Sequence, residues 1–118
     1  MKVLILEREK TIRQSLSNLM ERYKNFEVFS AHSCKEGNFL FQTISIDMVL
    51  CGDRLPDGNS LEMLKKWMEE NPKLISILMT VHHDELARQE AMRAGIRGYL
   101  VKPFDLKQLE EAMNLSHL

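Results

Sequence analysis

The sequence predicts an α/β fold in which five parallel strands alternate with five helices. Short apolar runs, each of the length of one buried strand, recur along the chain, and a segment with the apolar spacing of a helix follows each run. This alternation is typical of a parallel sheet with helices on both faces, joined by right-handed crossovers. In such a sheet the loops after the strands line the ligand crevice, so we expect the functional residues there.

The predicted strands cover residues 2–6, 26–31, 48–51, 74–79 and 99–101. Helices are predicted from Thr11, over 34–43, 60–70 and 84–94, and from Asp105. The helix over 34–43 has the weakest support, because Gly37 and Asn38 are poor interior helix residues. Gly95 supplies a left-handed cap after 84–94, and Asp105 with Gln108 forms a cap-like helix start.

Helical spacing also predicts which side chains face the core. The inward positions are Ile12, Leu16, Leu19, Met20 and Tyr23 in the first helix, Leu61, Leu64 and Met68 in the third, Ala87, Ala91 and Ala94 in the fourth, and Leu106, Leu109 and Ala112 or Met113 in the last. In the third helix, Met63 and Trp67 are expected beside this face.

Composition limits the class of protein. A chain of 118 residues fits one domain, and a net charge of -1 gives no electrostatic basis for binding nucleic acid or an anionic membrane. Cys34 and Cys51 lie in apolar surroundings, and the sequence shows neither a signal peptide nor a long apolar span. We therefore expect a cytoplasmic domain with reduced, buried thiols.

The segment Asp47–Gly58 carries the most specific pattern. An acid is followed by an apolar run, and Leu55-Pro56-Asp57-Gly58 closes the segment. It resembles the third strand and following loop of a response-regulator receiver domain of two-component signal transduction. Residues 94–104, with their Lys-Pro-Phe, resemble the family's fifth strand and the loop after it. The resemblance covers roughly residues 2–113 and implies a flavodoxin-like (βα)5 doubly wound sandwich with strand order 2-1-3-4-5.

The resemblance also implies a chemistry. In such a domain an Asp takes a phosphoryl group from a kinase histidine, and Mg²⁺ held by acids after strand one neutralises the developing charge. Thr80 matches the family's hydroxyl residue and Lys102 matches its lysine, which both contact the phosphoryl oxygens. Tyr99 matches the aromatic residue that changes position when such a domain is switched. By the same resemblance, the Lys102–Pro103 peptide bond is expected to be cis.

The reacting half of this chemistry is missing. The acceptor position falls on Gly52, and Arg8 stands where an acid usually touches the metal, between Glu7 and Glu9. A guanidinium repels a cation and stays charged at any ordinary pH. Asp53 comes one residue late, and because strand side chains alternate faces we expect its carboxylate to point away from the crevice.

Three interpretations follow. The favoured one is a degenerate receiver (a pseudo-receiver), not an enzyme and without a cofactor, in which Arg8 supplies a fixed positive charge near the crevice acids. The alternative is a phospho-accepting receiver that uses Asp53, with Mg²⁺ held by Glu7 and Asp53; this needs a bulge, which Gly52 permits. The third is a small-molecule-binding module on the same scaffold, although no Gly-rich phosphate loop follows the first strand.

The expected partners are proteins. We expect residues 1–118 to form one receiver domain, as the N-terminal part of a longer bacterial regulator of transcription. Its partners would be an output domain or another protein, with a sensor histidine kinase and a second copy of the chain as further candidates. His82 and His83 are not expected to bind metal, and Asp57 and Asn59 are expected to serve as turn and cap residues.

Overall fold

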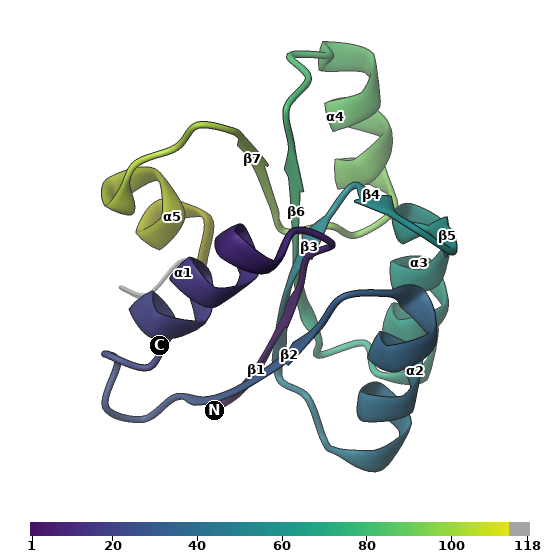
Figure 1. The fold of residues 1–118 in the computed structure, drawn as a ribbon. Helices are drawn as coiled ribbons and strands as arrows, with labels where there is room; N and C mark the ends of the chain where they lie inside the picture. The colour runs from purple at the N-terminus through teal and green to yellow at the C-terminus, as the bar shows by residue number, and fades with distance from the viewer. Residues whose placement is uncertain (114–118) are drawn as a thin grey trace.

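A five-stranded parallel sheet forms the centre of the protein, in the order β2-β1-β3-β6-β7. The computed structural model describes residues 1–113 (Figure 1). The strands of this sheet are β1 (Lys2–Leu6), β2 (Glu27–Ala31), β3 (Met48–Gly52), β6 (Ile75–Thr80) and β7 (Gly98–Val101). The helices are α1 (Lys10–Met20), α2 (Cys34–Thr43), α3 (Ser60–Glu70), α4 (Glu85–Arg93) and α5 (Leu106–Met113). If only the five strands of this sheet are numbered in chain order, β6 is the fourth and β7 the fifth. The strand order is then 2-1-3-4-5, as predicted.

One small element was not predicted. The loop after β3 contains a short antiparallel pair, β4 (Arg54–Leu55) with β5 (Gly58–Asn59). Each of its strands has two residues, which is too short for an alternation of polar and apolar side chains to show in the sequence.

The helices divide between the two faces of the sheet. Helices α1 and α5 cover one face, and α2, α3 and α4 cover the other (Figure 1). Every residue of β3 and β6 is buried, as expected for central strands covered on both sides. Since all five strands run in parallel, their carboxyl ends lie at one edge of the sheet and bring the following loops together.

The predicted helix ends are confirmed by their hydrogen bonds. The predicted cap Asn59 accepts from the Glu62 amide at the start of α3, whereas Asp84, expected as the first residue of the helix over 84–94, caps α4, which begins at Glu85. Asp105 and Gln108 exchange side-chain-to-amide hydrogen bonds of 2.8 and 2.9 Å. Gly95 follows α4 with a φ of 107°, the left-handed conformation that favours glycine.

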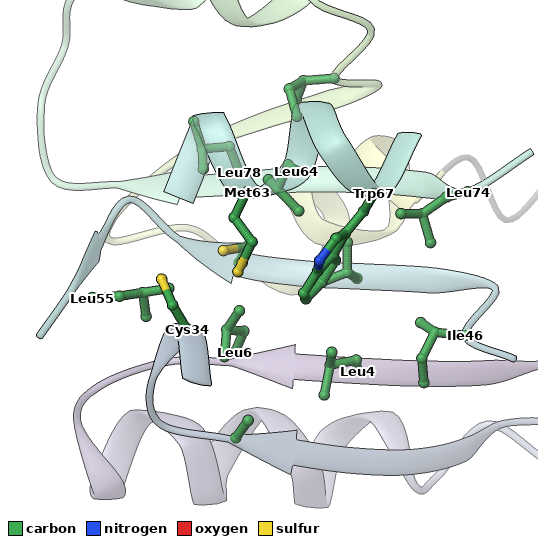
Figure 2. Close-up of a cluster of buried hydrophobic side chains, with 14 of the residues drawn as sticks. Leu4, Leu6, Cys34, Ile46, Leu55, Met63, Leu64, Trp67, Leu74 and Leu78 are labelled. Carbon is green, nitrogen blue, oxygen red and sulfur yellow. The ribbon is translucent and has the colours of Figure 1, made fainter. Parts of the chain in front are cut away.

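Helix α2 forms where predicted, and packing explains its two unfavourable residues. A Cβ at position 37 would lie 3.1 Å from both methyl groups of Leu6, so the glycine lets the helix approach β1 closely. The Asn38 side chain accepts a hydrogen bond of 2.7 Å from the indole of Trp67, which lies in the apolar cluster beneath α2 and α3 (Figure 2). Trp67 also stacks on Phe41 with ring centroids 4.4 Å apart. Tertiary contacts therefore compensate for low helix propensity here.

Some predicted core faces need correction. In α3 the buried apolar residues are Met63, Leu64 and Trp67, whereas Leu61 and Met68 are only partly buried. In α4 only Ala91 is buried, and in α5 Leu106 is 47% exposed. Helix α4 packs at the β7 edge of the sheet, where the apolar surface available to a helix is narrow.

The two cysteines are free and buried, as predicted. Burial raises the pKa of Cys51 to about 12, so this thiol is neutral at physiological pH. Among the helices of residues 1–113, none combines the length and the apolar character that a bilayer crossing needs.

Candidate functional site

A depression of about 230 Å³ lies at the carboxyl ends of the strands. Glu7 follows β1, Gly52 ends β3 and Lys102 follows β7, so the fold brings together residues that are far apart in the sequence. The crevice is lined by Glu7, Arg8, Glu9, Ile12, Gly52, Asp53, Arg54, Val81 and Lys102. Of the predicted site residues, the crevice brings together Glu7, Arg8, Glu9, Gly52, Asp53 and Lys102.

Gly52 leaves room that another side chain occupies. A Cβ at this position would lie 3.1 Å from Oε1 of Glu7, which is tighter than ordinary van der Waals contact. The Gly52 carbonyl accepts hydrogen bonds from the Ser60 hydroxyl at 2.6 Å and the Cys51 thiol at 3.3 Å, which fix the end of β3. The space in front of Gly52 is thus taken up by the Glu7 carboxylate.

Glu7 and Lys102 form an ion pair across the crevice. Lys102 Nζ lies 2.6 Å from Glu7 Oε1, and the Glu9 amide donates to Glu7 Oε2 at 2.8 Å. The Glu7 side chain is 3% exposed and that of Lys102 is 21% exposed, so water screens this pair less than a surface pair. Both oxygens of Glu7 and the charge of Lys102 are therefore engaged within the protein.

The cation that pairs with a crevice acid is Lys102, whereas Arg8 lines the crevice without such a pair. Arg8 is exposed and, within residues 1–113, makes no ion pair. A residue not singled out by the sequence, Arg13 of α1, donates from Nη1 to the Glu7 carbonyl at 2.8 Å. It thereby holds the β1–α1 loop, and no local pattern marks it for this role.

Asp53 lies at the crevice beside the end of β6 and is held there by two hydrogen bonds. Asp53 lines the crevice, and its Oδ2 accepts a hydrogen bond of 2.7 Å from the Thr80 hydroxyl. The pairing of β3 with β6 runs without interruption to Gly52 and Met79, so no bulge turns Asp53 there. Instead, the Asp53 amide donates to the Met79 carbonyl at 2.8 Å and keeps Asp53 beside the end of β6.

Tyr99 is half-buried on β7 and is influenced by the acids of the site. Burial is the main cause that raises the pKa of Tyr99, and the negative charges of Asp53 and Asp84 raise it further. The neighbouring Thr80 hydroxyl acts in the opposite direction. The Lys102–Pro103 peptide bond is cis, as the resemblance implied.

The charges that line the crevice balance one another. Three carboxylates (Glu7, Glu9, Asp53) stand against three cationic side chains (Arg8, Arg54, Lys102). A site built for a divalent cation has an excess of oxygen ligands and negative charge. The lining of this crevice therefore carries no excess of negative charge.

Fold and crevice together define a signalling module of the receiver class. The family described as the response regulator receiver domain matches residues 3–114. The chain therefore belongs to the response regulator receiver domain family, whose members act in two-component signalling, pair with histidine kinases and output domains, and are signalling modules rather than enzymes in the usual sense.

Individual relatives agree with this assignment. The chain is 32% identical over 108 residues to the regulatory protein AtoC of Escherichia coli (strain K12), covering 92% of this chain and 23% of that protein. It is 26% identical to a chemotaxis protein CheY homolog of Campylobacter jejuni, covering 96% of this chain and 89% of the homolog. A receiver domain protein from Clostridium thermocellum superposes with a TM-score of 0.85 at 31% identity, over 98% of this chain and 92% of that one. The chain spans about a quarter of the length of regulators such as AtoC and PilR of Pseudomonas aeruginosa.

Proposed function

We propose that this chain is a receiver domain that works without aspartyl phosphorylation and regulates an output domain or partner protein through its surface. The observation that carries this proposal is the glycine at position 52, with the Glu7 carboxylate lying against it and paired with Lys102. An acyl phosphate needs a carboxylate nucleophile at the acceptor position, and Gly52 offers none. The lysine that would receive the phosphoryl group is already neutralised by Glu7.

The oxygen donors of the crevice do not fit a magnesium ion. Both Glu7 oxygens are bound within the protein, and the charged group of the adjacent residue is the Arg8 guanidinium. Mg²⁺ is usually bound by one or two carboxylates in near-octahedral geometry. We therefore propose that the module acts without a bound metal.

The alternative is phosphorylation of Asp53. One observation favours it, because Asp53 is among the residues that line the crevice. Two observations count against it: Thr80 already donates to its carboxylate, and Lys102 is engaged by Glu7. The family match favours either receiver interpretation over a small-molecule-binding module.

Treatment with a small phosphodonor and Mg²⁺ tests the proposal. We expect the intact mass of the full chain to stay unchanged and the fluorescence of Trp67 to be unaffected. A receiver that carries the acceptor Asp serves as positive control, and Asp53→Asn serves as the matched variant. A phosphoryl adduct on the parent chain that is absent from Asp53→Asn would establish the alternative and overturn the proposal.

The proposed partners follow from the family and from the extent of the chain. Because the chain corresponds to about a quarter of regulators such as AtoC, we propose that the receiver acts on an output domain or on a separate protein. From the family, we also propose that it acts in the cytoplasm. A histidine kinase and a second copy of the chain are further candidates. The net charge of -1 gives this domain no electrostatic attraction to nucleic acid or to an anionic membrane.

A further inference from the structure

Two loops at the crevice are tied together by side-chain and backbone contacts. Residues 53–54, after β3, meet residues 79–82, which end β6 and begin the β6–α4 loop. The Thr80 hydroxyl donates to Asp53 Oδ2 at 2.7 Å, the Asp53 amide donates to the Met79 carbonyl at 2.8 Å, and Arg54 Nη2 lies 2.7 Å from His82 Nε2. We call these contacts between segments 53–54 and 79–82 the loop clasp.

Thr80 is the centre of the loop clasp. It is 1% exposed, and its hydroxyl has a single proton, which it donates to the Asp53 carboxylate. The same oxygen accepts from the His82 amide at 3.1 Å, so the orientation of Thr80 sets the start of the β6–α4 loop. A hydrogen bond to a carboxylate is stronger than one between neutral groups, and here the hydroxyl end is dry.

The segment beyond Thr80 has few other attachments. Residues 81–84 are all exposed, and α4 buries only Ala91 against the sheet. Segments with few buried apolar contacts open locally at low free-energy cost. The position of this loop and the first turn of α4 therefore depends strongly on the contacts made by Thr80.

We propose that the Asp53 carboxylate is an internal partner of Thr80 that holds the β6–α4 loop and the start of α4 in one arrangement without phosphorylation. This inference rests on the proposed function and adds the device that replaces the phosphoryl group. Asp53 is thus a positioning residue: it acts through Thr80, and it presents the α4 surface to partners in one fixed form.

Hydrogen–deuterium exchange of the full chain tests the loop clasp. We expect Asp53→Ala and Thr80→Val each to speed exchange in residues 81–88 about tenfold, as expected for loss of one charge-assisted hydrogen bond. The double variant should exchange no faster than Thr80→Val alone, since both changes remove the same contact. Thr80→Ser, which keeps the hydroxyl, should retain most of the protection of residues 81–88. Asp53→Asn keeps a neutral acceptor, so its exchange rate should lie between those of the parent chain and Asp53→Ala.

Asp57→Asn is the matched control. Asp57 lies in the same loop as Asp53 but accepts from the amides of Cys34 and Lys35 at the start of α2. Its substitution should speed exchange in residues 34–37 and leave residues 81–88 unchanged. Unchanged exchange of residues 81–88 in folded Asp53→Ala, or additive effects in the double variant, would overturn the inference.

The failure of this inference is distinguishable from failure of the proposed function. The phosphodonor experiment measures mass and decides whether Asp53 is phosphorylated, whereas exchange is measured with no phosphodonor present. No adduct together with unchanged exchange in Asp53→Ala would leave the proposed function in place and reject the loop clasp. An adduct on Asp53 would reject both, because a modified carboxylate could not serve as a permanent partner.

Discussion

Replacement of Lys102 by Met is the sharpest test of the pairing in the crevice. The change keeps much of the side-chain volume and removes the charge that lies 2.6 Å from Glu7 Oε1. The Glu7 carboxylate, 3% exposed, would then be left with the Glu9 amide as its remaining donor within residues 1–113. A buried charge without a counter-charge is costly, so the folded state should lose stability.

The structure sets the size of the loss. Removing one partner of a fully buried ion pair costs about 3–5 kcal/mol. Lys102 is 21% exposed, so water screens part of this interaction, and we expect a loss of about 2–3 kcal/mol in the free energy of unfolding. Adding Glu7→Gln should recover most of it, to within about 1 kcal/mol of the parent chain, because the double variant buries no unpaired charge and Gln can still accept from the Glu9 amide.

Urea unfolding followed by Trp67 fluorescence measures this difference. Trp67 is 2% exposed and stacked on Phe41, so its emission should report unfolding of the core. With a slope of about 2 kcal/mol per molar urea, the Lys102→Met midpoint should fall by about 1–1.5 M. Lys65→Met is the matched control: Lys65 lies 3.5 Å from Glu62 in an exposed pair, and its loss should cost less than about 0.5 kcal/mol.

Two results would refute this account of the crevice. A loss below about 1 kcal/mol in Lys102→Met would show that Glu7 is well solvated or finds another counter-charge. A double variant as unstable as Lys102→Met alone would show that the cost lies in packing rather than in the unpaired carboxylate.

Two further predictions concern positions outside the crevice. The Ser76 hydroxyl is fully buried and has no hydrogen-bond partner within residues 1–113, so Ser76→Ala should raise the free energy of unfolding by up to about 1 kcal/mol, measured by urea unfolding. A loss of stability would mean that the hydroxyl is satisfied. Hydrogen bonds from the Lys35 and Cys34 amides lower the pKa of Asp57. A carboxyl whose pKa is lowered by folding stabilises the protein above its unfolded-state pKa, and this contribution is lost as the pH falls through the folded-state pKa. The melting temperature of Asp57→Asn should therefore fall less than that of the parent chain as the pH is lowered from neutral to about pH 2. The same pH dependence in both chains would contradict a role for the Asp57 carboxylate in capping α2.

Local signals account for most of what the sequence predicts about the fold. Apolar runs and helical spacing depend on residues within one element, and the caps at Asn59, Asp105 and Gly95 depend on residues a few positions apart. These features fix where each element starts and ends. The helix faces were less accurate, because burial of a side chain such as Ala87 in α4 depends on how much sheet lies beneath the helix, and α4 packs against the edge strand β7.

The amino-acid sequence alone determined that a glycine stands at position 52 and an arginine at position 8, since residue identities need no coordinates. Only the tertiary structure decided what fills the space. Glu7 and Lys102 are 95 residues apart, and Asp53 and Thr80 are 27 apart, so neither pairing leaves a trace in local periodicity. Contacts of this kind depend on the direction of side chains at the ends of neighbouring strands, which the packing of the whole sheet sets.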